Sequence, residues 1–273
     1  MIKLNPTLEK SQFEQRFPEE LIEIIALTGH SGVSGSKFGE RSLWTASISL
    51  LAWKDLRNGQ HVIKKEISLD WLVTDEELEE SRDLLQSHTI VKLQVRKAEN
   101  MMMLVRVLDT HYQDDELEKI LQEELKPVYY NDEILGQFEL EKSVNLFQKE
   151  ITWLNEDCSL YFNWDENKAA MDESLKTAHE LFNNQAQWDK AIRNYAAKEL
   201  VDLANDWLQD NEEAEITEIT KELFVELMSI DSISVYNDGE FEIFFSDGDM
   251  FWGHSIIVNG DINGNFTSAE IAG

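Results

Sequence analysis

The first third of the chain alternates apolar and polar residues as half-buried β-strands do. In Leu43–Trp53, the apolar residues Trp44, Ala46, Ile48 and Leu50 alternate with threonine and serines. Four more segments carry strand patterns: Leu21–Thr28, His61–Val73, Thr89–Arg96 and Met101–Leu108. Between the third and fourth of these five strands, Thr74 and Glu77 form a capping-box sequence that predicts a short helix, Asp75–Gln86.

Three strands, one helix and two strands is the element order of the OB-type Greek-key barrel. Small α+β sheets can share this order, so the order alone leaves both architectures open. We predict an OB-like, five-stranded, β-rich domain with one helix over residues 1–110. A helical linker is predicted over residues 111–132, with an acidic helix at Asp114–Leu125 that Pro127 ends.

Residues 133–273 combine strand patterns with a long helical region. Apolar residues recur at helical spacing through Lys168–Leu208, with a break near Asn183–Gln185, and a third helix is predicted at Thr217–Ser229. The predicted strands are Ile134–Leu140, Leu146–Leu154, Cys158–Trp164, Ser232–Tyr236, Glu240–Ser246, Phe251–Asn259 and Phe266–Ala272. We therefore predict an α+β chain whose C-terminal domain is an antiparallel sheet packed with about three helices.

One stretch near the C-terminus contains several residues that could take part in catalysis or ligand binding. Asp247-Gly248 predicts a tight hairpin turn, followed by Asp249 and then a strand. The strand phase places Trp252 and His254 on one face with Ile256 and Val258, which is typical of a core face. We interpret His254 as a hydrogen-bonded core histidine. The alternative is a general acid or base assisted by Asp247 or Asp249.

Composition narrows the class of protein. Apolar residues make up 42% of the 273 residues, enough for a sizeable core, and the single cysteine, Cys158, cannot form an internal disulfide. The N-terminal segment lacks the apolar core of a signal peptide, and no apolar run approaches the roughly 20 residues that span a bilayer. We expect a cytoplasmic protein that does not bind membranes.

Acidic residues are concentrated in the second half. Residues 1–110 carry 14 Lys and Arg against 17 Asp and Glu, whereas residues 111–273 carry 10 against 37. Such a surface repels phosphates and attracts basic proteins. The sequence therefore disfavours nucleic-acid binding and suggests a basic protein as partner. Solubility alone is the other explanation of the charge.

The glycine-rich loop Gly29–Gly39 resembles a phosphate-binding loop without matching one. Its lysine follows a serine, and the next predicted element is a strand, so the loop lacks the helix N-terminus of a Walker A motif. His30, Lys37 and Arg41 could bind an anion at this barrel rim, and a mobile loop without ligand is the alternative.

No catalytic residue, cofactor or metal site is predicted. The six histidines lack zinc-type spacing, and a single cysteine cannot build a structural zinc site. Asp261–Glu270 misses the EF-hand spacing of glycine and glutamate and fits a hairpin turn at Asn263-Gly264. Asp249, Trp252 and His254 stand with the three loop residues as candidate ligand-binding residues.

Three segments of the second half resemble a known family. They are ILGQFELEKSVNLFQKEITW (Ile134–Trp153), QAQWDKAIRNYAAKELVDLANDWL (Gln185–Leu208) and the ending Asp238–Gly273, in which FWGHSIIV precedes a glycine-containing turn and AEIAG. Over about residues 133–273 they are similar to the bacterial domain of unknown function 2262. The first half resembles the region that accompanies this domain. The resemblance implies a bacterial, cytosolic α+β domain and assigns no activity or catalytic residue.

These observations favour a non-enzymatic protein-binding module. Its acidic face would steer a basic partner that then docks around exposed aromatics, as an immunity-type protein neutralises a toxin. The alternative is an enzyme or small-ligand binder that uses the Gly29–Gly39 loop or the Trp252/His254 face. Single-stranded nucleic-acid binding by the barrel is disfavoured, because that half is itself slightly acidic.

Overall fold

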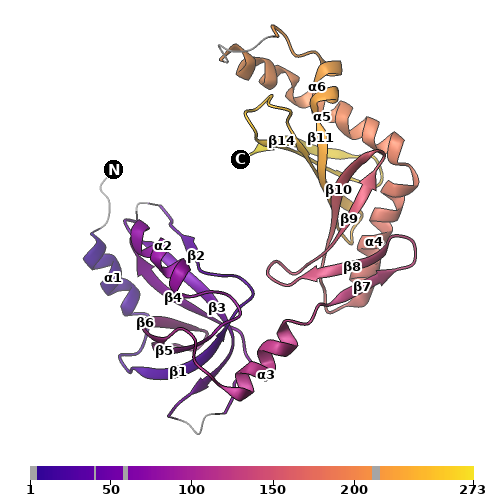
Figure 1. Cartoon of the computed structure of the whole chain (residues 1–273). Coiled ribbons are helices and arrows are strands. Elements are labelled where there is room, and N and C mark those ends of the chain that lie inside the picture. Colours follow the sequence, from indigo (N-terminus) through magenta and orange to yellow (C-terminus); the bar gives the residue numbers. More distant parts are fainter. Residues whose placement is uncertain (1–4, 40, 58–60, 211–215) are drawn as a thin grey trace. The chain divides into compact units, whose positions relative to one another are not determined.

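The chain folds into two compact units, Met1–Lys126 and Pro127–Gly273 (Figure 1). The computed structural model describes residues 5–39, 41–57, 61–210 and 216–273. Both units combine helices with sheet, which confirms the predicted α+β class. No helix within these described residues is long and apolar enough to cross a membrane.

The first unit is built on a closed five-stranded barrel. Its strands follow one another around the ring as β1, β3, β4, β6, β5 and back to β1, and β4 pairs in parallel with β6. This is the strand order of an OB barrel, as predicted. A short strand, β2, extends the sheet beyond β3. The strands are β1 (Ile22–Thr28), β2 (Ser34–Ser36), β3 (Trp44–Asp55), β4 (Ile67–Val73), β5 (Ile90–Lys97) and β6 (Met101–Asp109).

The predicted alternation in β3 places one row of its side chains in the core of the barrel. Ala46, Ile48 and Leu50 point inward and are buried, while the serines between them stay half-buried on the outer face. Helix α2 (Asp75–Leu84) begins with the predicted capping box. The Thr74 backbone N–H donates to the Glu77 carboxylate at 2.8 Å, and the Glu77 N–H donates to the Thr74 hydroxyl at 3.2 Å.

The barrel carries one helix that the prediction missed. Helix α1 (Pro6–Glu14) begins at the N-cap Asn5, whose side chain accepts a hydrogen bond from the Thr7 N–H at 2.9 Å. Phe13 lies in the helix and Phe17 lies just beyond it. Both pack on Met103 and cover the outer surface of β4 and β6. Asn-Pro is a helix-start signal, but a nine-residue helix with only one buried aromatic shows little apolar periodicity.

Helix α3 (Asp115–Glu124) belongs to the first unit, although the sequence suggests a linker there. Leu117 is fully buried against Ile25 and Leu27, on the outside of β1. The Lys54 ammonium, itself buried, donates to both carboxylate oxygens of the N-cap residue Asp114 at 2.7 and 2.8 Å. The first unit therefore extends through α3 to Lys126, and the second begins at Pro127.

The second unit is an eight-stranded sheet with its strands in the order β14-β13-β12-β11-β10-β9-β8-β7. One pair, β10 with β11, is parallel, because three helices cross over between these strands. The predicted sheet with about three helices is confirmed, with this parallel pair as a departure. The strands are β7 (Tyr129–Asp132), β8 (Gly136–Glu141), β9 (Leu146–Trp153), β10 (Glu156–Asn163), β11 (Ser229–Val235), β12 (Glu240–Ser246), β13 (Ser255–Asp261) and β14 (Phe266–Ala272).

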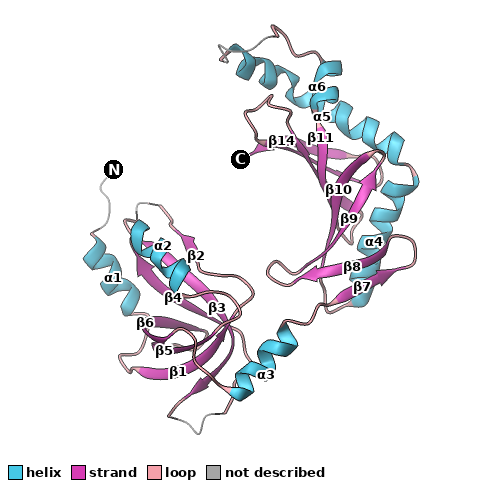
Figure 2. Cartoon of the chain, viewed as in Figure 1, coloured by secondary structure: helices cyan, strands magenta, loops and turns pink. Residues whose placement is uncertain are grey.

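The helices pack on one face of this sheet (Figure 2). Helix α4 (Lys168–Asn183) contacts β10 and β11, and helix α5 (Gln185–Gln209) contacts β13 and β14. The break between them falls at Asn184, as the sequence predicts, and α6 (Lys221–Leu227) follows. Residues 211–215 of the acidic segment before α6 lie outside the described residues.

Candidate functional site

The three candidate residues of the barrel loop have three different surroundings. The His30 ring shares a 2.9 Å hydrogen bond with His88 and lies 3.6 Å from the Glu124 carboxylate. The Lys37 ammonium lies 5.2 Å from the centre of the Trp44 ring, on the side of the loop that faces α2.

Arg41 is exposed and lies beside α1. With Glu9, Gln12 and Arg16 it lines a shallow cavity of about 290 Å³. The buried Glu9 carboxylate accepts hydrogen bonds from the backbone N–H groups of Ser42 and Leu43, and so fixes the end of the loop to α1. The loop is thus held in place at several points, and its three basic residues do not share one binding pocket.

The candidate residues near the C-terminus lie in a wound loop and not in a strand. Strand β12 ends at Ser246 and β13 begins at Ser255. Residues 247–254 between them form consecutive turns, so the prediction of a strand from Phe251 is wrong at its first four residues. The strand phase fails with it, and Trp252 does not share a face with Ile256 and Val258.

The buried carboxylate of Asp247 organises this loop. The side chain is 3% exposed and accepts hydrogen bonds from the backbone N–H groups of Asp249, Phe251 and Gly253. Three donors aimed at one carboxylate satisfy its charge without water. The loop closes around Asp247 because these bonds are available only when it is wound.

Trp252 is the most unusual residue of this loop. Its side chain is 57% exposed, and its backbone has a φ of 56°, in the left-handed region that bulky side chains avoid. Such a conformation costs on the order of 1–3 kcal/mol, and residues held in it cluster at functional sites. The Trp252 ring rests on Trp207 of α5, with 4.7 Å between ring centres.

His254 lies on the same tryptophan and is half-buried. Its ring centre is 5.3 Å from that of Trp207, edge to face, and its Nδ1–H donates to the Phe251 carbonyl at 2.6 Å. Gly273 lies close to this ring, because a Cβ added to it would come within 2.6 Å of the His254 Cδ2 atom. Asp249 is exposed, and its backbone N–H donates a hydrogen bond to the Asp247 carboxylate at 3.2 Å.

Residues 132–271 of the chain, which lie almost entirely in the second unit, match the model of a family described as an uncharacterized protein conserved in bacteria (DUF2262). The chain belongs to this family. Residues 9–124, which cover the barrel and α3, match a domain of unknown function (DUF7021). Both matches agree with the resemblance that the sequence suggested. A search of curated proteins finds no match.

Solved structures add little to this assignment. The wild-type single-stranded DNA binding protein from Thermus aquaticus is similar at 11% identity, over 54% of this chain and 74% of that one, with a TM-score of 0.22. A deletion mutant of the same protein gives 9% identity over 52% and 74%, with the same TM-score. At this TM-score the similarity supports no conclusion about fold or function.

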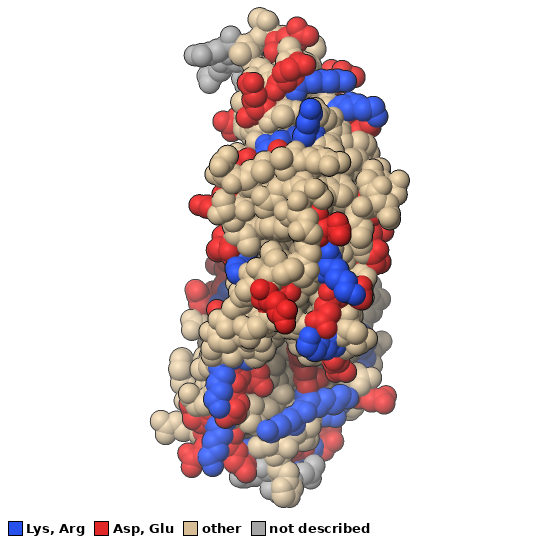
Figure 3. Space-filling model, turned by 90° about the vertical axis from the view of Figure 1, so that its right-hand side faces the viewer, with Lys and Arg blue, Asp and Glu red and all other residues tan. Residues whose placement is uncertain are grey.

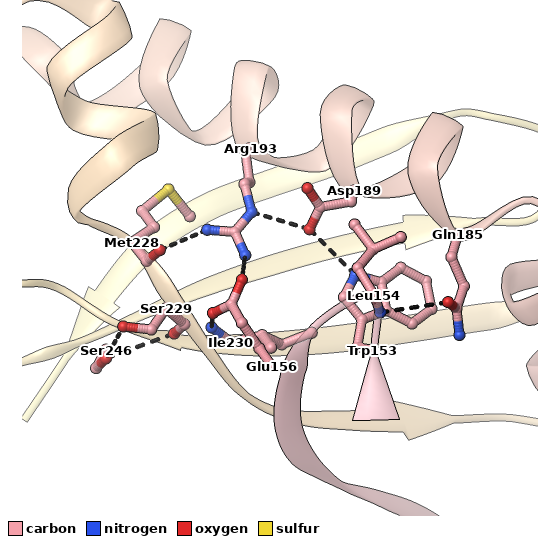
Figure 4. A network of polar contacts seen from close by, with 10 residues as sticks. All are labelled: Trp153, Leu154, Glu156, Gln185, Asp189, Arg193, Met228, Ser229, Ile230 and Ser246. Atoms are coloured by element: carbon pink, nitrogen blue, oxygen red, sulfur yellow. Dashed lines mark hydrogen bonds and ion pairs between the residues drawn. The ribbon is translucent and has the colours of Figure 1, made fainter. Parts of the chain in front are cut away.

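A second polar cluster in the DUF2262 domain is structural. Arg193 of α5 is buried and donates to the Asp189 carboxylate, the Glu156 carboxylate and the Met228 carbonyl (Figure 4). Asp189 also accepts a hydrogen bond from the Trp153 indole N–H at 3.1 Å. All three guanidinium nitrogens have partners, so the cluster fastens α5 to the sheet.

On the face shown in Figure 3, the Asp and Glu residues do not form one continuous acidic surface. There, acidic residues occur in small groups that alternate with basic and uncharged ones. Among the described residues, no group of three or more His, Cys, Asp or Glu side chains could hold a metal ion. The loop at residues 247–254 is thus the best candidate site, because it exposes an aromatic side chain at a cost in backbone strain.

The sequence does not indicate the structural roles of two residues of this site. Trp207 supports the rings of both Trp252 and His254, and Asp247 holds the loop in shape. The helical spacing of apolar residues in Lys168–Leu208 gives Trp207 no role beyond packing, and Asp247-Gly248 predicts only a turn, with Asp247 as a possible partner of His254. The available signal was the length of the segment between two strand patterns, which contains two Asp and two Gly residues and exceeds a two-residue turn.

Proposed function

We propose that this DUF2262 protein is a non-enzymatic protein-binding module and that Trp252 is the anchor of its binding surface. One observation carries the proposal: a bulky, exposed aromatic is held in a left-handed backbone conformation by a buried carboxylate. Tryptophan is enriched among the few residues that dominate protein interfaces. A preorganised ring also loses little conformational freedom on binding.

The partner we propose is a basic protein, of the kind that an immunity-type protein neutralises. Residues 111–273 carry 37 acidic against 10 basic residues, far more than the roughly 2–8 charges that solubility requires. Such a charge accelerates the encounter with a basic protein and does so less at high salt. Docking on Trp252 would then set the lifetime of the complex.

Replacing Trp252 with alanine is expected to weaken partner binding at least about 30-fold, since buried anchor residues contribute 2 kcal/mol or more. The partner is first isolated from the native cell with the wild-type chain. The purified partner is then titrated against wild type and variant by calorimetry at two salt concentrations. The affinity should fall with salt for both proteins.

The matched control is Trp164→Ala, since Trp164 is another exposed tryptophan of the same unit, at 42% exposure. We expect this variant to bind like wild type. Equal losses for the two variants, or none for Trp252→Ala, would show that the loop is not the binding surface.

A further inference from the structure

The face of the C-terminal sheet opposite the helices carries a row of large side chains interrupted by serines. The register of β10, β11 and β12 aligns Tyr161, Ser234 and Glu242 across three neighbouring strands. One step along, Ser232 lies beside Phe244. All five side chains are half-buried, and none of the aromatics belongs to the core between sheet and helices.

The serines make this row a groove. Ser232 and Ser234 of β11 are small and form its floor, and Tyr161 of β10 and Phe244 of β12 stand on either side. The cavity has a volume of about 470 Å³ and is also lined by Val144, Leu146, Asn163, Tyr236 and Glu242. Its aromatic walls and volume suit the stem of one long side chain.

Glu242 gives the groove its charge. This half-buried carboxylate has neither an ion pair nor a hydrogen bond within the part of the chain that the structure describes. Burial, together with the nearby Glu270, raises the pKa of Glu242 above its ordinary value. Burial and the charge of Glu242 likewise raise the pKa of Tyr236. A half-buried carboxylate without a partner is partly desolvated, which is unfavourable, and a cation would relieve that cost.

Among the described residues, no positively charged side chain pairs with Glu242. None of the residues that the structure places along the groove is a lysine, arginine or histidine. Arginine fits the walls best among cationic side chains, because its planar guanidinium stacks on aromatic rings and pairs with a carboxylate through two hydrogen bonds. Lysine offers only a compact, strongly hydrated charge.

We propose that the groove between Tyr161 and Phe244 binds an arginine side chain of a partner protein, with its guanidinium on Glu242. The inference rests on the proposed function for the source of the arginine. The groove itself is argued from its own geometry, and the loop at Trp252 is not part of it.

The test uses the full chain and the capped peptide acetyl-Gly-Arg-Gly-amide, followed by amide chemical shifts in a two-dimensional NMR titration. We expect saturable shifts at Tyr161, Ser232 and Ser234 at millimolar peptide. The same peptide with citrulline, which is arginine's neutral counterpart, should bind at least about tenfold more weakly. Binding of the arginine peptide should also lower the pKa of Glu242, measured from its carboxyl carbon shift.

Glu242→Gln should weaken binding of the arginine peptide at least about tenfold and leave the thermal midpoint unchanged or raised, because it removes an unpaired, half-buried charge. The matched control is Glu240→Gln, which makes the same charge change on an exposed residue of the same strand. An equal loss of peptide affinity in both variants would show that only the net charge of the protein matters, and it would overturn the inference. Equal binding of the citrulline peptide, or a lowered thermal midpoint in Glu242→Gln, would also overturn it.

The experiments can refute the groove and the Trp252 anchor independently of each other. Trp252→Ala should leave the peptide titration unchanged, because Trp252 does not line the groove. A failed titration together with a partner that still needs Trp252 would refute the groove alone. The converse result would refute Trp252 as the anchor and retain the groove.

Discussion

Replacing Arg193 with methionine is expected to destabilise the C-terminal unit by about 3 kcal/mol. The variant keeps the apolar stem and removes the guanidinium, which leaves Asp189 and Glu156 without their cation and the Met228 carbonyl without its donor. Removing one partner of a buried ion pair costs roughly 3–5 kcal/mol. Because Glu156 is 38% exposed and can recover water, the lower end of that range applies.

Labelling of the single cysteine reports the stability of the C-terminal unit in the full-length chain. Cys158 lies in β10 at the centre of the sheet, and burial, followed by the charges of Glu150 and Glu156, raises the pKa of its thiol to about 12. The folded thiol is therefore unreactive, and labelling by a disulfide reagent requires opening of the sheet. A loss of 3 kcal/mol should accelerate labelling of the native protein more than about 100-fold.

Lys190→Met is the control for Arg193→Met, since Lys190 is an exposed cation on the same helix. Exposed substitutions usually change stability by less than about 0.5 kcal/mol, so its labelling rate should stay within about threefold of wild type. Comparable rates for the two variants would mean that the Arg193 cluster contributes nothing beyond helix propensity.

The elements that the sequence predicts well are those in which periodicity alone decides burial. Strand β3 alternates cleanly because one face lies in the barrel and the other does not, and α2 begins where a capping box satisfies its first donors. The strand order then follows from the order of elements. The sequence pattern does not predict helix α1, because its packing depends on Phe13 and Phe17, which are four residues apart with no further apolar repeat.

The candidate sites were harder to predict because long-range contacts decide them. Alternation was extended through Phe251–His254, yet the carboxylate of Asp247 captures three backbone donors that a strand would have used otherwise. The groove depends on β10 and β11 lying side by side, although about 70 residues separate Tyr161 from Ser234 in the chain. The only local hint is β12 itself, where Phe244 and Phe245 place apolar rings on both faces.

Gly248→Ala is expected to destabilise the C-terminal unit by about 3 kcal/mol. Gly248 has a φ of +56°, which costs an alanine roughly 1–2 kcal/mol. A Cβ there would also lie 2.5 Å from the carbonyl oxygen of Leu227 at the end of α6. That oxygen is backbone and cannot rotate away, so the loop or α6 must shift, at a further cost of about 1–3 kcal/mol. Cys158 labelling should accelerate accordingly.

Gly253→Ala separates the two causes. Gly253 lies in the same loop with a φ of +86°, but a Cβ added there meets no atom within 4 Å. This variant should show only the conformational cost, about 1–2 kcal/mol, and a labelling rate clearly below that of Gly248→Ala. If the two rates are equal, the close approach of the loop to α6 does not limit stability. A larger rate for Gly248→Ala, together with weaker partner binding, would connect the shape of the loop to the presentation of Trp252, since Asp247 positions both.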